Sequence, residues 1–440
     1  MILEFGIWIL EFDLMPRPVG FWTAVALVMG NMIGSGVFLL PASLAPYGGI
    51  SLGGWALSTA GSILLALVFA RLARFNPAAG GPYAYTRQAY GDLAGFLVAW
   101  GYWISIWCAN AAIAVAFVGY LDPFVPSVVH NPPAAALLAL ATMWLLVAVN
   151  IRGVATAGRV QVVTTALKVL PLVLIGIAGL LTLDPSHFAV SPEGPRGLAR
   201  GVTATATLTL WAFLGLECAT IPAGNIRDAE RTIPRATIVG TVLTAAIYIV
   251  STVGVMGVLG PAVLSQSTAP FADAARVLFG GRAADIVAIG AAISCFGALN
   301  GWILVVGQVP LAAANDGLFP SAFGRLSSRG TPAIGMIIAG VLTTGLIAMN
   351  YARGLVDLFT FVILLATLST LVPYAFCSLA GFMLQRRDAR MRMSGGAIAI
   401  AALAFVYSMW AIGGAGADVV YWGFLLLMSG LPVYAWIARS

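Results

Sequence analysis

Charged side chains are scarce in this sequence. They make up 9% of the 440 residues, whereas 60% of the residues are hydrophobic. A soluble domain is about a quarter charged, so this composition excludes a protein whose whole surface faces water. The remaining solvent is lipid, in which only helices and closed barrels satisfy their own backbone. The apolar runs are long and continuous rather than short alternations, which favours helices.

Histidine and cysteine are also rare, and their positions argue against a metal site. The two histidines, His130 and His187, lie outside the apolar runs, and the four cysteines lie inside them without paired spacing. Metal sites need several such ligands at close spacing, so we expect no metal ion and no cofactor. The net charge of +6 comes from basic residues that form no continuous patch. We therefore expect no nucleic-acid partner.

Long apolar runs dominate what is present. A membrane-spanning helix needs about 20 apolar residues, and the runs between charges and Gly/Pro punctuation predict twelve spans. Their ranges are 20–46, 50–72, 93–121, 134–151, 157–183, 200–226, 233–259, 284–312, 331–351, 355–382, 394–413 and 417–437. We interpret residues 1–18 as an N-terminal extension before a membrane domain over 19–440. Within that extension, Met15 begins a sequence that is more typical of a natural start.

Basic residues concentrate on one predicted side of the membrane. With a cytoplasmic N-terminus, most of the 22 lysines and arginines fall on the cytoplasmic side. The residues on the other side are Arg196, Arg200, Arg276, Arg282 and Arg353. Because cytoplasmic loops carry an excess of lysine and arginine, we predict that both termini are cytoplasmic.

The first and the sixth predicted spans each contain a glycine-rich interruption. The first contains GNMIGSG over 30–36, and the sixth contains FLGLECATIPAG over 213–224. Glycine costs a helix about 1 kcal/mol against alanine, so the clusters predict helix breaks at Gly34-Ser35-Gly36 and near Leu214 to Glu217. Inverted-repeat transporters bind their solute where such broken helices meet. The alternative interpretation is close helix packing through small residues.

The spacing of the two breaks predicts an internal repeat. They are five spans apart, as expected of a five-plus-five inverted repeat. The repeats would cover 20–183 and 200–382, with two peripheral helices over 394–437.

Two ionisable residues lie inside predicted spans. Glu217 stands in the middle of the sixth span, where a charged carboxylate costs at least about 2.5 kcal/mol. It is therefore a functional candidate, or a structural carboxylate that ties broken backbone together. Lys168 is the only lysine of the chain and lies inside the fifth span. It either snorkels to the interface or acts as a buried ammonium that gains and loses a proton.

Three further polar or aromatic residues lie in mid-span. Trp211 precedes Glu217 by about a turn and a half, and Trp302 follows Asn300-Gly301 in the eighth span. Their rings could enclose a cationic or apolar side chain, or they could simply pack in the core. Asn110 in the third span is either a hydrogen-bonding link between helices or a ligand for a polar substrate tail.

The sequence resembles the amino acid–polyamine–organocation superfamily, specifically its basic amino acid/polyamine antiporters and above all those that exchange arginine for agmatine. The matching stretches are GNMIGSGVFLLPASLAPYGGISLGGW, GGPYAYTRQAYG, TLWAFLGLECATIPAGNIRDAERTIPRAT, PFADAARVLFG and GQVPLAAANDGLFP. The resemblance covers nearly the whole chain after about Pro18. It implies an all-α membrane protein of twelve transmembrane helices with a LeuT-type fold, and transport by alternating access.

By position, the resemblance implies a set of substrate-binding residues. The backbone amides and hydroxyl at Ser35 and Gly36 are expected to hold a substrate carboxylate, because a helix N-terminus offers free N–H groups and a positive dipole end. Backbone carbonyls at Met32, Trp211 and Leu214 are expected to hold the α-ammonium.

The resemblance also assigns roles to side chains. Trp211 is expected to form an aromatic lid, Trp302 a platform for the substrate side chain, and Asn110 a contact for its tail. The residues linked to gating or coupling are Tyr83, Tyr102, Tyr374 and Glu217.

Two departures from the arginine:agmatine pattern widen the choice of substrate. Lys168 resembles the fifth-span lysine of proton-coupled and exchanger relatives, where it takes the place of a sodium ion. Pocket positions that help to hold guanidinium in those antiporters are altered, namely Ser105, Ile106, Ile113 and Ala366. Exchange of a cationic amino acid for its decarboxylated amine is our leading hypothesis. The alternative is proton-coupled transport or exchange of neutral amino acids.

Other classes of protein are disfavoured. A membrane-embedded enzyme would need a nucleophile–base pair or a metal cluster in its spans, and a channel would need charged rings or carbonyl-filter repeats. The sequence contains none of these patterns. The resemblance further implies a multi-pass protein of the bacterial inner membrane that forms a homodimer.

Overall fold

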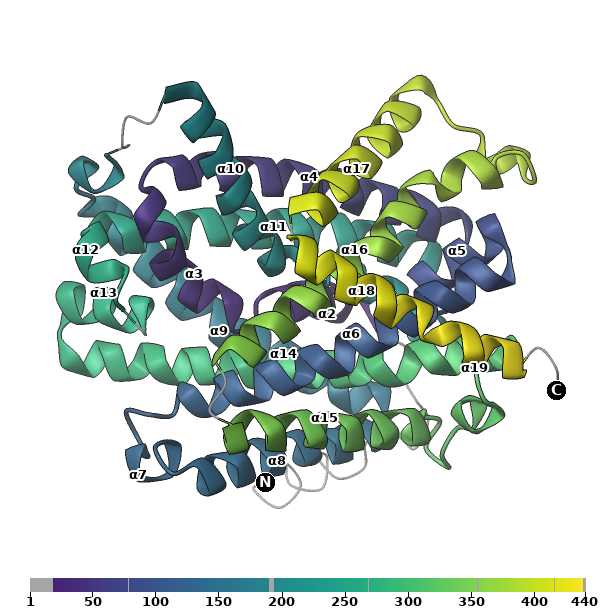
Figure 1. Cartoon of the computed structure of the whole chain (residues 1–440), viewed down its shortest axis with the longest axis horizontal. Coiled ribbons are helices and arrows are strands. Elements are labelled where there is room, and N and C mark those ends of the chain that lie inside the picture. Colours follow the sequence, from purple (N-terminus) through teal and green to yellow (C-terminus); the bar gives the residue numbers. More distant parts are fainter. Residues whose placement is uncertain are drawn as a thin grey trace, which may run out of the picture.

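The protein is a bundle of α-helices (Figure 1). The computed structural model describes residues 19–77, 79–189, 194–267, 269–353, 356–414 and 416–437. The predicted extension over 1–18 lies outside the described residues. Val19, at the start of the described chain, forms an isolated β-bridge with Ile226 after the sixth span. That bridge anchors the beginning of the first span beside the end of the sixth.

The elements follow one another along the chain. Those up to residue 189 are α2 (Phe21–Met32), α3 (Gly36–Leu44), η1 (Ala45–Tyr47), α4 (Ile50–Phe75), α5 (Pro82–Tyr90), α6 (Asp92–Gly119), α7 (Pro126–Val129), α8 (Pro132–Ile151), α9 (Val154–Leu181) and η2 (Pro185–Phe188). Those from 194 to 315 are α10 (Gly194–Leu210), η3 (Trp211–Phe213), η4 (Cys218–Thr220), η5 (Ala223–Asn225), α11 (Ala229–Val258), α12 (Pro261–Leu264), α13 (Pro270–Phe279) and α14 (Gly281–Asn315). The last are η6 (Ser321–Gly324), α15 (Ala333–Arg353), α16 (Val356–Leu384), η7 (Ala389–Met391), α17 (Gly395–Gly414), α18 (Ala417–Met428) and α19 (Gly430–Ile437).

The predicted spans are confirmed as helices, and most of their boundaries lie within a few residues of the prediction. Within the described residues, 11 helices are long and apolar enough to cross a membrane. The remaining span is the first, which is divided into α2 and α3. The sixth span differs from the prediction in its second half, where α10 gives way at Leu210 to short 3₁₀ turns. Gly215 at φ +107° and Pro222, which lacks an N–H, explain why no regular helix continues there.

Several short helices lie between the spans. These are α5, α7, α12 and α13, and each begins with proline at its first position. Proline suits that position because its fixed φ is helical and its missing N–H would be unpaired anyway. The predicted twelve spans did not include these helices, because each is too short to cross a bilayer.

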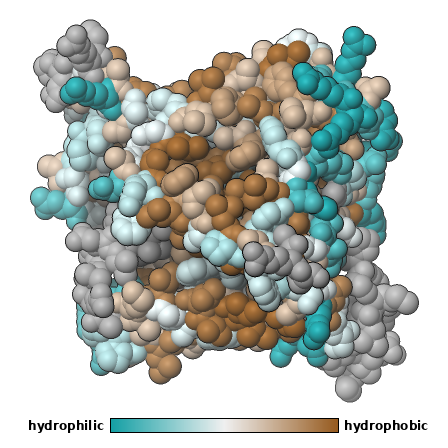
Figure 2. Space-filling model, turned by 45° about the vertical axis from the view of Figure 1, so that its right-hand side comes forward, coloured by the Kyte–Doolittle hydropathy of each residue, from teal (hydrophilic) through white to brown (hydrophobic). Residues whose placement is uncertain are grey.

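The long helices run side by side between two ends (Figure 1). One end carries α5 and the last turn of α19, and we name it the α5 end. The opposite end carries α7, α12 and α13, and we name it the α13 end. Figure 2 shows brown apolar side chains across the middle of one face and teal hydrophilic side chains along its edges. An apolar belt between two polar rims is the surface that a lipid bilayer requires.

Helix α14 lies in the centre of the bundle. It packs against α6, α9 and α2, and most of its residues are buried. By contrast, few residues of α17 and α18 are buried. The buried centre holds the two helix breaks, because α2 contacts η4 and α3 contacts η3.

Candidate functional site

The first break separates α2 from α3. Helix α2 ends at Met32, Ile33 has a non-helical backbone (φ −77°, ψ 89°), and α3 begins at Gly36. The N–H groups at the start of a helix have no intrahelical acceptor. Among the described residues, the amides of Ser35, Gly36 and Val37 have no acceptor either. The N-terminus of α3 therefore presents free N–H donors and a partial positive charge inside the bundle.

The second break follows α10. After the turn Trp211–Phe213, Leu214 is extended (φ −66°, ψ 135°) and Gly215 takes a positive φ. The carbonyl of Ala212 accepts a hydrogen bond of 2.9 Å from the hydroxyl of Tyr248. The carbonyl of Leu214 has no partner within the described part of the chain. The break thus presents a free carbonyl close to the free amides of the first break.

A cavity of about 40 Å³ lies between the two breaks. Its lining includes seven of the eight predicted substrate-binding residues, namely Met32, Ser35, Gly36, Ser105, Trp211, Leu214 and Trp302. Asn110 is buried but is not part of the lining, and its Oδ1 has no protein partner among the described residues. A volume of this size holds a few water molecules. An amino acid can therefore enter only after the surrounding helices move apart.

Gly36 is the point at which the two breaks touch. A Cβ atom built on Gly36 would lie 2.7 Å from Cδ1 and 2.8 Å from Nε1 of Trp211. Cβ atoms essentially never come so close to another heavy atom, so a side chain at this position would displace the indole. The indole of Trp211 consequently contacts the start of α3.

The carboxylate of Glu217 joins the second break to two long helices. It is fully buried, and its two oxygens accept hydrogen bonds from the hydroxyls of Tyr102 on α6 and Tyr374 on α16. The amide of Gly215 in turn donates to the Tyr374 hydroxyl at 3.4 Å. The three residues predicted separately from the sequence therefore form one network. Movement of α6 or α16 relative to the break would disrupt these hydrogen bonds.

Lys168 points to the first break and not to the membrane interface. Its side chain is fully buried, and Nζ donates to the carbonyls of Gly30, at 2.6 Å, and Ile33. Ser294 on α14 donates to the carbonyls of Ile33 and Gly34, each at 3.2 Å. The snorkelling interpretation is therefore wrong, because this ammonium replaces the N–H groups that α2 loses where it ends.

A chain of hydrogen bonds between buried side-chain amides leads to Asn31, near the end of α2. Asn31 accepts from Gln161 at 3.4 Å, and Gln161 accepts from Asn300 at 3.2 Å. Asn150 donates to Oδ1 of Asn300 at 3.1 Å. The indole N–H of Trp302 donates to the carbonyl of Asn31 at 3.2 Å. Trp302 is therefore fixed in orientation as well as packed.

Several contributors to the site were not singled out from the sequence. Tyr120 donates to the carbonyl of Ser35 at 3.3 Å, Tyr248 binds Ala212, and Thr370 lines the cavity. Nothing in the local sequence of Tyr120 or Tyr248 marks them. The helical spacing of Ser105, Ile106, Ala109 and Ile113 places them on one face of α6, and that pattern could have added Ala109.

A second polar network lies at the α5 end. Tyr83 donates to Asp316 at 2.8 Å, and Arg87 pairs with Asp316 at 2.9 Å and with Asp92 at 2.8 Å. The amide of Gly80 donates to the carbonyl of Ile221 at 3.0 Å, which links this loop to the sixth span. Burial raises the pKa of the Tyr83 phenol, and Asp316 raises that pKa further. Tyr83 therefore stays protonated at physiological pH and acts as a donor.

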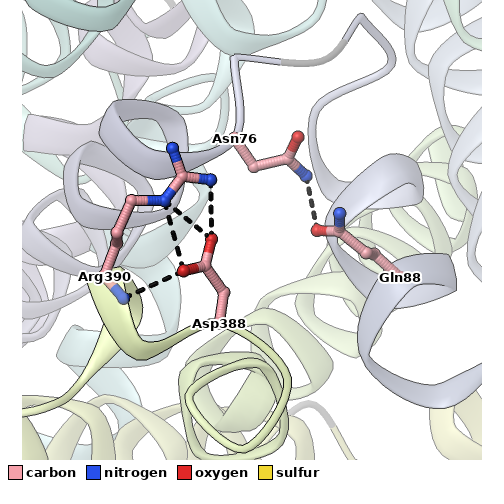
Figure 3. A network of polar contacts seen from close by, with 4 residues as sticks. All are labelled: Asn76, Gln88, Asp388 and Arg390. Atoms are coloured by element: carbon pink, nitrogen blue, oxygen red, sulfur yellow. Dashed lines mark hydrogen bonds and ion pairs between the residues drawn. The ribbon is translucent and has the colours of Figure 1, made fainter.

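Figure 3 shows the neighbouring polar contacts at this end. Asn76 donates to Gln88 at 2.7 Å, and Arg390 binds Asp388 through Nη2 at 2.8 Å and Nε at 3.1 Å. The hydrogen bonds from Arg390 hold the pKa of Asp388 below its ordinary value. Asp388 is therefore ionised and already paired at neutral pH. In the part of the chain that the structure describes, no three His, Cys, Asp or Glu side chains come together as metal ligands.

We expect Asp316→Asn to loosen the α5 end. The change removes the ion pair with Arg87 but leaves an oxygen that accepts from Tyr83, and a partly exposed pair is worth about 1 kcal/mol. A cysteine placed at Ala312, which lines a cavity beside this network, should therefore react about fivefold faster with a charged maleimide. The native cysteines are buried and should not interfere. Asp388→Asn is the matched control, and an equal acceleration in that variant would contradict the assignment.

Known proteins resemble the chain over most of its length. A family model described as "Amino acid permease" matches residues 19–424. The cadaverine/lysine antiporter of Escherichia coli K12 is 36% identical over 82% of this chain and 82% of its own length. The putative arginine/ornithine antiporter of Bacillus subtilis is 34% identical, with 96% and 97% covered. The putrescine transporter PotE of Haemophilus influenzae is 30% identical, again with 96% and 97% covered.

The family match over residues 19–424 spans both helix breaks and the α5-end network. Together with the membrane-spanning helices, the family match and these relatives establish what kind of membrane protein this is: a transporter and not an enzyme. The chain belongs to the amino acid permease family of the amino acid–polyamine–organocation superfamily.

Proposed function

We propose that this transporter exchanges a cationic amino acid for its decarboxylated amine across the bacterial inner membrane. The observation that carries the proposal is the pairing of free amides at Gly36 with a free carbonyl at Leu214 across one cavity. Such a pair suits a zwitterion, because the amides attract the carboxylate and the carbonyl attracts the ammonium. No charged protein side chain is needed for this part of the substrate.

The substrate side chain would lie between aromatic and polar groups. Trp211 and Trp302 line the cavity and offer ring faces to a cation. Asn110 has a buried amide oxygen without a protein partner, which suits the terminal ammonium or guanidinium of a long substrate. We assign Asn110 to this contact once the cavity has widened along α6.

The relatives differ in the solutes that their names give. They are named for cadaverine and lysine, for arginine and ornithine, and for putrescine. All of these are cationic amino acids or amines. We propose substrates of this class for the present chain, with arginine and agmatine among the candidates.

A second candidate function is proton-coupled transport or exchange of neutral amino acids. Ile106, Ile113 and Ala366 make part of the cavity lining apolar, and no acidic side chain lines it among the described residues. The buried ammonium of Lys168 adds a positive charge behind the first break. Both features suit a neutral side chain better than a dication.

Counterflow in proteoliposomes separates these two functions. Vesicles loaded with unlabelled agmatine, putrescine or cadaverine should take up labelled arginine or lysine, and empty vesicles should not. Alanine- or leucine-loaded vesicles serve as the comparison. Net uptake of a neutral amino acid driven by a pH gradient, without exchange of any cationic pair, would contradict the leading proposal.

Coupling is proposed to reside in the residues around the breaks. Glu217, Tyr102 and Tyr374 connect the second break to α6 and α16, and Lys168 connects α9 to the first break. Alternating access requires these elements to change their contacts. We propose Tyr83 as part of the closure at the α5 end, through its bond to Asp316.

We expect Lys168→Met to slow transport by about tenfold and to change its pH dependence. Methionine has a similar length but cannot donate, so the carbonyls of Gly30 and Ile33 lose a charged hydrogen bond. Initial exchange rates between pH 5 and pH 8 provide the measurement. Leu167→Met on the exposed face of α9 is the control. A rate and pH profile like those of the control would remove Lys168 from the coupling role.

Topology, symmetry and assembly are also proposals. Arg71, Arg74 and Arg87 lie at the α5 end, so we propose that this end faces the cytoplasm, with both termini there. We propose that 20–183 and 200–382 are inverted repeats, since each begins with a broken span. The exposed apolar faces of α17 and α18 are compatible with a homodimer.

A further inference from the structure

A cleft of about 360 Å³ lies at the α5 end, away from the substrate cavity. It is formed by α4, α16 and the beginning of α17. Most of its walls are apolar, including Leu67, Val68, Met393, Ile400 and Ala401. Among the described residues, no acidic side chain lines the cleft. The cleft therefore combines apolar walls with a position beside α17, few of whose residues are buried.

Arg71 supplies a positive charge to this cleft. Its Nη2 donates to the carbonyls of Met391, at 3.0 Å, and Arg392, at 2.9 Å. Its Nε is buried without a partner, and its Nη1 has none either among the described residues. Since Nε is buried and Nη2 is occupied, Nη1 is the donor that this guanidinium can offer to a phosphate or carboxylate group in the cleft.

The beginning of α17 adds backbone donors beside Arg71. This helix has 20 residues, and Ser394, Gly396 and Ala397 line the cleft. The amide of Ala397 donates to Oγ of Ser394 at 3.3 Å, whereas the amides of Gly395 and Gly396 have no acceptor in the described part of the chain. Free amides at a helix N-terminus attract anions. Their position next to an unpaired guanidinium makes one composite anion site.

Asp388, the acid in the segment between α16 and α17, does not neutralise this site. The carboxylate of Asp388 accepts hydrogen bonds from the guanidinium and from the backbone amide of Arg390 (Figure 3). Arg74 and Arg386 are exposed nearby and form no ion pair with a described residue. The local charge around the cleft is therefore positive.

We propose that this cleft binds an anionic phospholipid. The headgroup phosphate would lie on Arg71 and the free amides of α17, and an acyl chain would lie along the apolar walls. The apolar walls favour a lipid over a free phosphate ion, because a small anion would leave them exposed to water. The inner wall of the cleft includes Ser378, whose hydroxyl donates to the carbonyl of Tyr374 at 2.8 Å. A bound lipid would thus brace the turn of α16 that holds Glu217.

Native mass spectrometry of the purified full chain tests the proposal. Dioleoylphosphatidylglycerol should bind at least about tenfold more tightly than dioleoylphosphatidylcholine, since one close arginine contributes about fivefold and the helix amides add to it. Arg71→Gln should reduce phosphatidylglycerol binding by about fivefold or more. Arg74→Gln is the control, because Arg74 does not line the cleft, and it should change binding less than twofold.

A second variant separates loss of the site from a folding defect. Ala397→Phe keeps all charges but places a ring in the cleft, so it should also reduce phosphatidylglycerol binding, while a single symmetric peak in size-exclusion chromatography confirms a folded protein. Inorganic phosphate at millimolar concentration should not displace the lipid. Equal binding of the two lipids, equal effects of the Arg71 and Arg74 substitutions, unchanged binding by Ala397→Phe, or displacement by inorganic phosphate would each overturn the proposal.

Discussion

Gly36→Ala is expected to reduce substrate affinity and exchange by about 100-fold while leaving the protein inserted and folded. The new Cβ would lie 2.7 Å from the indole of Trp211, and overpacking of this kind costs about 1–3 kcal/mol. The displaced indole would no longer cover the start of α3, so hydrogen bonding to the carboxylate would weaken as well. Together the two effects amount to about 3 kcal/mol, or about 100-fold in affinity. Equilibrium binding and initial exchange rates measure the effect.

Gly345→Ala is the matched control for this substitution. Gly345 also lies in a membrane-spanning helix, α15, but a Cβ atom built on it meets nothing within 4 Å. We expect this control to bind and exchange within about twofold of the unmodified protein, because surface substitutions have small effects. Full activity of Gly36→Ala would show that the contact between the two breaks has no part in recognition.

Glu217→Gln is expected to retain substrate binding and to lose most of the pH dependence of transport. The carboxylate accepts from the hydroxyls of Tyr102 and Tyr374, one on each oxygen. Glutamine has one acceptor oxygen and does not titrate, so one buried hydroxyl loses its acceptor at a cost of about 1–3 kcal/mol. Affinity should remain within about threefold, whereas exchange should slow by about tenfold or more. The measurements are binding at pH 7 and exchange rates from pH 5 to pH 8.

Tyr374→Phe distinguishes loss of the carboxyl group from loss of the network. This variant removes one hydrogen bond to Glu217 but keeps the titratable group. We expect slower exchange with the pH dependence preserved. If Glu217→Gln keeps the pH profile of the unmodified protein, Glu217 has no role in coupling.

The apolar composition and the positions of charged, glycine and proline residues were sufficient to predict the membrane-spanning helices. Continuous apolar runs predicted the spans, because a segment that crosses the bilayer must form all of its backbone hydrogen bonds internally. Glycine clusters at Gly34 to Gly36 and around Gly215 located both breaks, since glycine is the residue that weakens a helix locally. The sequence did not predict that the sixth span would continue as 3₁₀ turns beyond Leu210. That outcome depends on packing against α2 and α11 as well as on Pro222.

Residues of the two breaks could be placed around the cavity because backbone geometry defines that part of it. Ser35, Gly36 and Leu214 belong to the breaks themselves and line the cavity, and their contact with substrate stays a prediction. Partners from distant segments were harder to foresee. Tyr120 and Ser294 bind carbonyls of the first break, but contacts between residues 85 or more positions apart leave no local pattern in a single sequence. Asn110 lies beside the cavity and not on its lining, so its predicted contact with substrate stays a prediction.

Lys168 illustrates why depth along a helix does not fix a side chain's direction. Its position on α9 allowed either snorkelling or burial, and the carbonyls freed at Gly30 and Ile33 decide between them. Those carbonyls exist because α2 ends at Met32. One break in the backbone therefore determines both the substrate cavity and the place of the buried ammonium.

The most direct test of the account is competition between an amino acid and its own carboxamide for binding to the purified transporter. The amino acid used is the one that counterflow identifies. Its carboxamide differs only at the group that we place at the start of α3, where a neutral amide with one acceptor oxygen replaces the carboxylate. Because hydrogen bonds to a charged group are about twice as strong as neutral ones, the carboxamide should compete at least about tenfold more weakly. Equal competition by the two compounds would contradict recognition of the carboxylate at Ser35 and Gly36.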